Sequence, residues 1–147
     1  MNVLVVHHSK FGNGKQVADA IADGIRSKGH TVEVKTVGDV KKDDLRNYDA
    51  FVIGSPTHAR GPTFKISGFI SRLSRTASGK PFVAWATYGA PGMKTVAKLE
   101  AKATKMKVLI KGKAFKVKDM QGPLEDGALQ DAVAFGKEIG THLGSAR

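Results

Sequence analysis

The sequence predicts an α/β protein in which helices cover both faces of a parallel β-sheet. Short apolar segments of strand length alternate with longer segments whose apolar residues recur at helical spacing. The connections between them are a few residues long, and no linker or internal repeat interrupts the alternation. With 147 residues, 41% hydrophobic and 25% charged, the chain is expected to form one domain, residues 1–147.

The first half of the chain shows this alternation most clearly. Residues 3–6 are a continuous apolar run, as expected for a strand buried on both faces. Residues 15–28 carry apolar side chains at helical spacing. Residues 31–37 alternate apolar and polar positions like an edge strand. A short helical turn at 41–46 then leads to a second buried strand at 50–54.

The second half continues the alternation to the end of the chain. Its predicted segments are a helix marked by Phe64, Ile66, Phe69, Ile70 and Leu73, a strand at 82–86, a helix at 93–106, a strand at 108–110 that continues at 115–117, and a helix at 129–143. Gly112 is expected to break the fifth strand, and Gly136 and Gly140 to let the last helix approach the sheet closely. Right-handed crossovers then give a three-layer α/β/α sandwich with a five-stranded parallel sheet of order 2-1-3-4-5.

Three polar segments that contain glycine follow the first, third and fourth of these strands. Parallel strands end at one edge of their sheet, and open α/β sheets bind ligands there, where the strand order reverses. We therefore expect the three segments to form one small-molecule site. The candidate binding residues are Ser9, Lys10, Phe11, Gly12, Asn13 and Gly14 in the first segment, Ser55, Pro56, Thr57, His58, Ala59, Arg60 and Gly61 in the second, and Thr87, Tyr88, Gly89, Ala90 and Gly92 in the third.

The first segment has the features of an anion-binding loop. It runs directly into a helix, whose first N–H groups and positive dipole end attract phosphate. Gly12 and Gly14 permit a close approach of the backbone, while Ser9 and Asn13 add polar groups. Lys10 and Lys15 add positive charge nearby. The alternative is a plain glycine turn between a strand and a helix.

Other phosphate-binding motifs do not fit this sequence. Gly12 and Gly14 are not followed by the third glycine of a dinucleotide fingerprint, and no G-x-x-x-x-G-K-[ST] segment occurs. A phospho-receiver domain needs carboxylates where this chain has His7-His8 and Ser55-Pro56. These classes are therefore excluded by their chemistry.

The second and third segments can hold a planar ring. Tyr88 is placed to stack on the ring and His58 to form or support the opposite wall. Ser55, Thr57 and Thr87 supply hydroxyl groups for a sugar or ribityl chain. Taken alone, His58 could be a hydrated loop residue and Tyr88 could pack at a strand end. Together with the anion-binding loop, the three segments favour flavin mononucleotide (FMN).

Other potential ligand side chains are assigned to structure. Trp85 lies in the middle of a strand and is predicted to be core. His7 and His8 are consecutive and should point to opposite faces, so we expect no metal pair. The absence of cysteine excludes disulfides, iron–sulfur clusters and thiolate zinc sites.

At these three loops the chain resembles the flavodoxin family, in its short form without an insertion in the last strand. Residues 9–18 are similar to the family's phosphate loop, residues 54–61 to its second FMN loop, and residues 87–89 to its third. The chain departs from the family pattern where Gly14 replaces a hydroxyl residue and His58 an aromatic one.

The resemblance implies a function as well as a fold. Flavodoxins bind FMN non-covalently and carry electrons between redox partner proteins. By this resemblance, residues 9–14 hold the phosphate, Thr57 lies near the ribityl chain, and residues 58–61 and 87–92 border the isoalloxazine ring. The alternatives are a small FMN-dependent NAD(P)H:quinone or other acceptor oxidoreductase, and a basic binding module with a vestigial flavin site.

The charge of the chain is strongly positive and unevenly distributed. The formal net charge is +11, and residues 94–118 contain nine lysines against one acid, Glu100. Members of the flavodoxin family are typically acidic, so this surplus predicts redox partners with acidic docking surfaces. Nucleic acid or anionic membrane is expected only as nonspecific, salt-dependent attraction to Lys94–Lys118. The protein is expected to be a monomer or weak oligomer.

The sequence also predicts a location. No apolar run approaches the roughly 18 residues that span a bilayer. The first residues, Met1 to Val6, have the pattern of a strand and lack a basic leader. A cytoplasmic protein is therefore expected.

Overall fold

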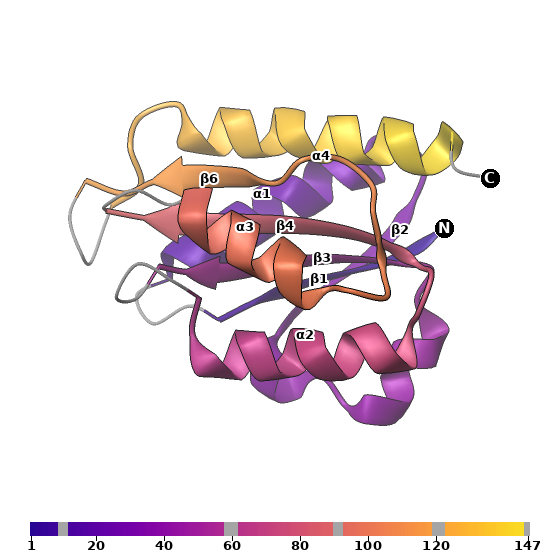
Figure 1. Ribbon diagram of the computed structural model, residues 1–147. Helices are drawn as coiled ribbons and strands as arrows, with labels where there is room; N and C mark the ends of the chain where they lie inside the picture. The colour runs from indigo at the N-terminus through magenta and orange to yellow at the C-terminus, as the bar shows by residue number, and fades with distance from the viewer. Residues whose placement is uncertain (9–11, 58–61, 90–92, 119–122, 146–147) are drawn as a thin grey trace.

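The computed structural model describes residues 1–8, 12–57, 62–89, 93–118 and 123–145. Its strands form one parallel sheet, and its helices lie on both faces (Figure 1). In chain order the elements are β1 (Asn2–His7), α1 (Asn13–Arg26), β2 (Thr31–Thr36), the 3-10 helices η1 (Val37–Asp39) and η2 (Lys42–Asn47), β3 (Ala50–Pro56), α2 (Phe64–Thr76), β4 (Pro81–Tyr88), α3 (Met93–Lys102), β5 (Lys107–Val108), β6 (Lys113–Lys116) and α4 (Ala128–Ser145).

The strand order is β2-β1-β3-β4-β5, with β6 also pairing with β4. This confirms the predicted order and the reversal between β1 and β3. Two short strands share the fifth position, since β5 pairs with the start of β4 and β6 with its end. Between them, Gly112 donates its N–H to a carboxylate oxygen of Glu100 (3.2 Å) and packs against the Ala84 carbonyl, so the break expected there is confirmed.

The sheet separates two apolar layers. Val3 and Val5 belong to the core under α1 and α4, while Leu4 and Val6 belong to the core under α2 and α3. This alternation follows from the two-residue period of a strand. Trp85 is 1% exposed within the first layer, which confirms its prediction as a core residue.

The glycines of α4 serve a different contact from the predicted one. A Cβ on Gly136 would collide with the Ile21 carbonyl oxygen, and one on Gly140 would lie 2.7 Å from the Lys28 Cβ. Both neighbours belong to α1 or the turn that follows it. The predicted approach to the sheet is therefore wrong: α4 lies beside α1 on the same face, and the glycines bring the two helices together.

The helix predicted at 93–106 ends earlier, at Lys102. The chain then turns, and the Lys105 N–H donates to the hydroxyl of Ser74 in α2 (2.8 Å). Met106 is still buried, but from the turn rather than from the helix. Among the described residues, no helix has both the length and the hydrophobicity needed to cross a bilayer.

Candidate functional site

The carboxyl ends of β3, β4 and β6 lie on one side of the molecule, the left in Figure 1. The strand register places Pro56 beside Thr87 and Tyr88 beside Lys116. Parallel pairing of β1 with β3 brings the end of β1 to the same edge. The described residues of all three predicted loops therefore meet at one edge of the sheet, as expected from the sequence.

The start of α1 is suited to an anion. Gly12 has φ +86°, a left-handed conformation that favours glycine, and no described atom lies within 4 Å of where its Cβ would stand. No side chain caps this helix in the part of the chain that the structure describes, and its first turn contains no acidic residue. A phosphate group fits these properties, because it would meet the positive end of the helix dipole without a competing carboxylate.

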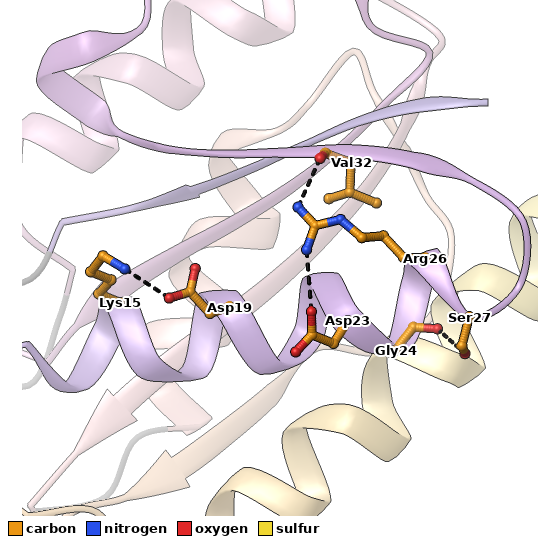
Figure 2. Close-up of polar contacts among 7 residues, drawn as sticks. All are labelled: Lys15, Asp19, Asp23, Gly24, Arg26, Ser27 and Val32. Carbon is orange, nitrogen blue, oxygen red and sulfur yellow. Dashed lines mark hydrogen bonds and ion pairs between the residues drawn. The ribbon is translucent and has the colours of Figure 1, made fainter.

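Two basic side chains of α1 are held by polar contacts. Figure 2 shows that Lys15 Nζ contacts Asp19 Oδ2 (2.8 Å), one turn further along the helix. At the far end, the Arg26 guanidinium contacts Asp23 (3.2 Å) and donates to the Val32 carbonyl (3.0 Å). Arg26 thereby ties the end of α1 to β2.

The base of the second loop is held by a short hydrogen-bond chain. The buried Ser55 hydroxyl donates to the Pro56 carbonyl (2.8 Å) and accepts from the Thr63 N–H (3.1 Å). The Thr63 hydroxyl caps α2 by accepting from the Ile66 N–H (3.4 Å), and it also bonds the His8 Nδ1 atom (2.9 Å). Ser55 thus supports the loop; its predicted contact with FMN stays a prediction.

The second and third loops are joined through Thr57. Its N–H donates to the Thr87 carbonyl (2.9 Å), and its hydroxyl is 2.9 Å from that of Thr95 in α3. Thr95 is fully buried, and Thr87 is 6% exposed. The Tyr88 carbonyl accepts from the Val117 N–H (2.8 Å), which anchors the third loop to the end of β6.

Sequence reasoning did not select His8, Thr63 and Thr95 for this site. Thr63 could have been found, because a threonine immediately before a helical pattern is a common N-cap. The pairing of Thr57 with Thr95 joins residues that are far apart in the chain, so no local pattern announces it. These residues position the loops.

The structure brings together half of the predicted binding residues. The described ones at this edge are Gly12, Asn13, Gly14, Ser55, Pro56, Thr57, Thr87, Tyr88 and Gly89. The remaining predicted residues lie outside the described part of the chain; they are Ser9, Lys10, Phe11, His58, Ala59, Arg60, Gly61, Ala90 and Gly92. Their roles stay predictions.

The two histidines at the end of β1, His7 in the strand and His8 directly after it, diverge as predicted. His8 contacts Thr63 at the start of α2, whereas the charges that act on His7 include Lys15 and Asp19 of α1. His7 is 5% exposed, and its Nδ1 atom has no hydrogen-bond partner among the described residues. Burial lowers the pKa of His7 below its ordinary value, with the positive charges of Lys15 and His8 acting in the same direction and Asp19 and Asp39 opposing.

The fold and this edge together define an α/β protein in which a helix start suited to an anion lies where the strand order reverses. Residues 4–125 match a family model described as a flavodoxin domain. The chain belongs to the flavodoxin family. This membership supports FMN as its cofactor, in agreement with the prediction from the three loops.

Individual relatives support the same family. The chain is 30% identical over 90 residues to an NAD(P)H dehydrogenase (quinone) of Cupriavidus metallidurans, covering 48% of this chain and 45% of that protein. It is 35% identical over 68 residues to a flavodoxin of Aquifex aeolicus, covering 46% and 37%. These matches span less than half the length of either relative. An archaeal flavodoxin structure superposes with a TM-score of 0.83 at 28% identity, covering 98% of this chain and 99% of that one.

Proposed function

We propose that this chain is an FMN-binding electron carrier that passes electrons between redox partner proteins. The observation that carries the proposal is the start of α1 at the reversal of strand order, where a left-handed Gly12 precedes a helix with no acid in its first turn. FMN supplies the redox chemistry. The protein binds and orients it and controls access to it.

Specific residues would hold the parts of FMN. Residues 9–14 would bind the phosphate through backbone N–H groups at the start of α1. Thr57, which joins the second and third loops, would bind the ribityl chain. Residues 58–61 and 87–92 would border the isoalloxazine ring. Residues 1–147 would act as one domain, and a cytoplasmic location stays a prediction from the sequence.

Titration of the protein with FMN and with riboflavin tests the cofactor assignment. Since riboflavin lacks the phosphate, FMN should bind at least about 100-fold more tightly, as expected if charge-assisted phosphate contacts contribute a few kcal/mol. Quenching of flavin fluorescence reports both affinities. No quenching by excess protein, or equal affinities for the two flavins, would contradict the proposal.

Substitution of Thr57 tests the ribityl contact. We expect Thr57→Ala to weaken FMN binding about fivefold, because one hydrogen bond contributes roughly 1 kcal/mol. Thr57→Ser keeps the hydroxyl and should bind FMN like the unchanged protein. Thr76→Ala, at the opposite end of α2, is the matched control and should have no effect. Equal affinities for all four proteins would remove Thr57 from the site.

The names of the relatives favour a second candidate function. Several relatives at about 30% identity are named NAD(P)H dehydrogenase (quinone), so this chain could itself oxidise NAD(P)H and reduce a quinone. Steady-state oxidation of NAD(P)H by the FMN-loaded protein, with a quinone present, separates the two. An electron carrier should show almost no turnover without a partner protein, whereas sustained turnover would favour the oxidoreductase.

A further inference from the structure

We propose that Phe64, Lys65 and Lys94 form a docking surface for an acidic partner protein. The surface lies at the edge of the sheet that carries the candidate FMN site. The inference rests on the proposed electron-carrier function, for which it specifies the chemistry of the partner and the place where it binds.

Phe64 supplies an apolar anchor. Its side chain is 97% exposed, whereas the next most exposed large apolar residues among those described, Val108 and Leu129, are 42% and 41% exposed. Ile66 and Phe69 of the same helix are buried against the sheet. Phe64 is not part of this core, so its ring is free to be buried in an interface, where removal of its apolar surface from water would favour binding.

The backbone that carries Phe64 is firmly held. The preceding residue, Thr63, bonds the hydroxyl of Ser55 at the end of β3 and the ring of His8 after β1. Its hydroxyl also caps α2. Because the backbone at this helix start is already fixed, binding need not order it, and aromatic side chains are common among the residues that dominate protein interfaces.

Two exposed lysines provide positive charge at the same edge. Lys65 follows Phe64 directly, and Lys94 lies in the first turn of α3. Both helices cover the same face of the sheet and begin at the carboxyl ends of β3 and β4 (Figure 1). Neither lysine is in an ion pair with a described residue, whereas Lys116 and Lys118 contact Glu125 and Asp126 (3.6 Å each). Their charges are therefore available to an acidic surface.

An acidic protein fits this surface better than a second copy of the chain or a nucleic acid. A second copy of the chain would bring two net charges of +11 together, which opposes association. Nucleic-acid surfaces typically combine arginine with several stacking aromatic rings. Here a single phenylalanine is accompanied by two lysines. Lysines around one apolar anchor suit a transient, electrostatically steered protein complex.

Binding of a small acidic cytochrome of the b5 type tests the proposal. The probe is titrated into the isotope-labelled, FMN-loaded protein, and NMR shifts report the affinity and the residues affected. Shifts should concentrate at the starts of α2 and α3. Phe64→Ser should weaken binding about tenfold, as expected for an interface anchor. The double variant Lys65→Glu/Lys94→Glu should weaken it similarly at low salt and much less at about 200 mM salt.

Matched controls lie at the opposite edge of the sheet, where β4 begins. Val108→Ser removes a half-exposed apolar side chain there, and Lys105→Glu/Lys107→Glu makes the same change in net charge. Both controls should alter the affinity less than twofold. Equal losses in the controls and in the docking-surface variants would overturn the proposal, because net charge alone would then explain the binding.

Two further measurements keep the proposal separate from the proposed function. FMN titration of every variant should give unchanged affinity, since these side chains do not belong to the proposed cofactor contacts. If the unchanged protein fails to bind FMN, the electron-carrier function fails. If FMN binds and the variants match their controls, only the docking surface fails. Tighter binding of a single-stranded oligonucleotide, or of phosphatidylserine vesicles, than of the cytochrome at 150 mM salt would also overturn it.

Discussion

The helices on the two faces of the sheet pack in different ways. On one face, α1 and α4 approach until backbone meets backbone: a Cβ on Gly136 would stand 3.0 Å from the Gly24 Cα and closer still to the Ile21 carbonyl oxygen. On the other face, α2 and α3 pack through large side chains such as Leu73 and Leu99, both fully buried. On the first face the two helices are in backbone contact with each other, whereas on the second face the helices are packed through large buried side chains.

The two kinds of packing support different parts of the proposed electron-carrier function. The close contact with α4 fixes α1, whose start is the candidate phosphate site. The other layer places the starts of α2 and α3, which carry Phe64, Lys65 and Lys94, at the proposed docking surface.

The largest expected effect comes from a substitution that breaks the close contact between α1 and α4. Gly136→Ala should lower the free energy of unfolding by about 3 kcal/mol or more, because the new methyl group meets backbone that cannot move aside. Gly68→Ala in α2 is the matched control. No described atom is near its Cβ position, so alanine should stabilise the helix by about 0.5–1 kcal/mol. Urea unfolding measures both, and equal effects would contradict the comparison.

A smaller effect is expected between α2 and the turn after α3. The buried Ser74 hydroxyl accepts from the Lys105 N–H, so Ser74→Ala leaves this donor unpaired and should cost roughly 1–2 kcal/mol. Ser71→Ala on the same helix removes only a bond to the Ser67 carbonyl of its own helix and should cost about 0.5 kcal/mol or less. Thermal unfolding tests this difference; similar losses would show that the turn is not held by Ser74.

The smallest expected effect is a pH dependence of the free energy of unfolding that comes from His7, whose charged neighbours include residues of α1. Burial lowers the pKa of His7 in the folded state below the ordinary value of 6.5. As the pH falls, the unfolded chain therefore takes up a proton at a higher pH than the folded protein does. The free energy of unfolding should therefore fall as the pH drops from about 6.5 towards the folded pKa, by at most about 1.4 kcal/mol per pH unit. Below the folded pKa this contribution no longer changes.

Replacement of His7 tests this assignment. Urea unfolding at several pH values should show a smaller loss of stability below pH 6.5 in His7→Val than in the unchanged protein. His142→Gln, at an exposed position on α4, is the control and should retain the original pH dependence. A pH profile unaltered by His7→Val would assign the acid sensitivity to other groups.

The sequence by itself determined the order of the elements and the edge at which the three loops meet. Apolar runs and helical spacing are local properties, and the strand order follows from chirality and from short connections. The burial of Trp85 and the break at Gly112 followed from the same local patterns.

Only the tertiary structure decided which distant groups touch. Three contacts join residues from separate elements, so no spacing along the chain reveals them. They are the Thr57–Thr95 contact, the packing of Gly136 against α1 and the hydrogen bonds of Thr63. Phe64 is the clearest case. Its apolar character fits the spacing of the predicted helix, yet its ring is exposed to solvent at the first residue of α2. Which residues of a helix are exposed depends on how the helix packs on the sheet, and the sequence pattern alone does not show this.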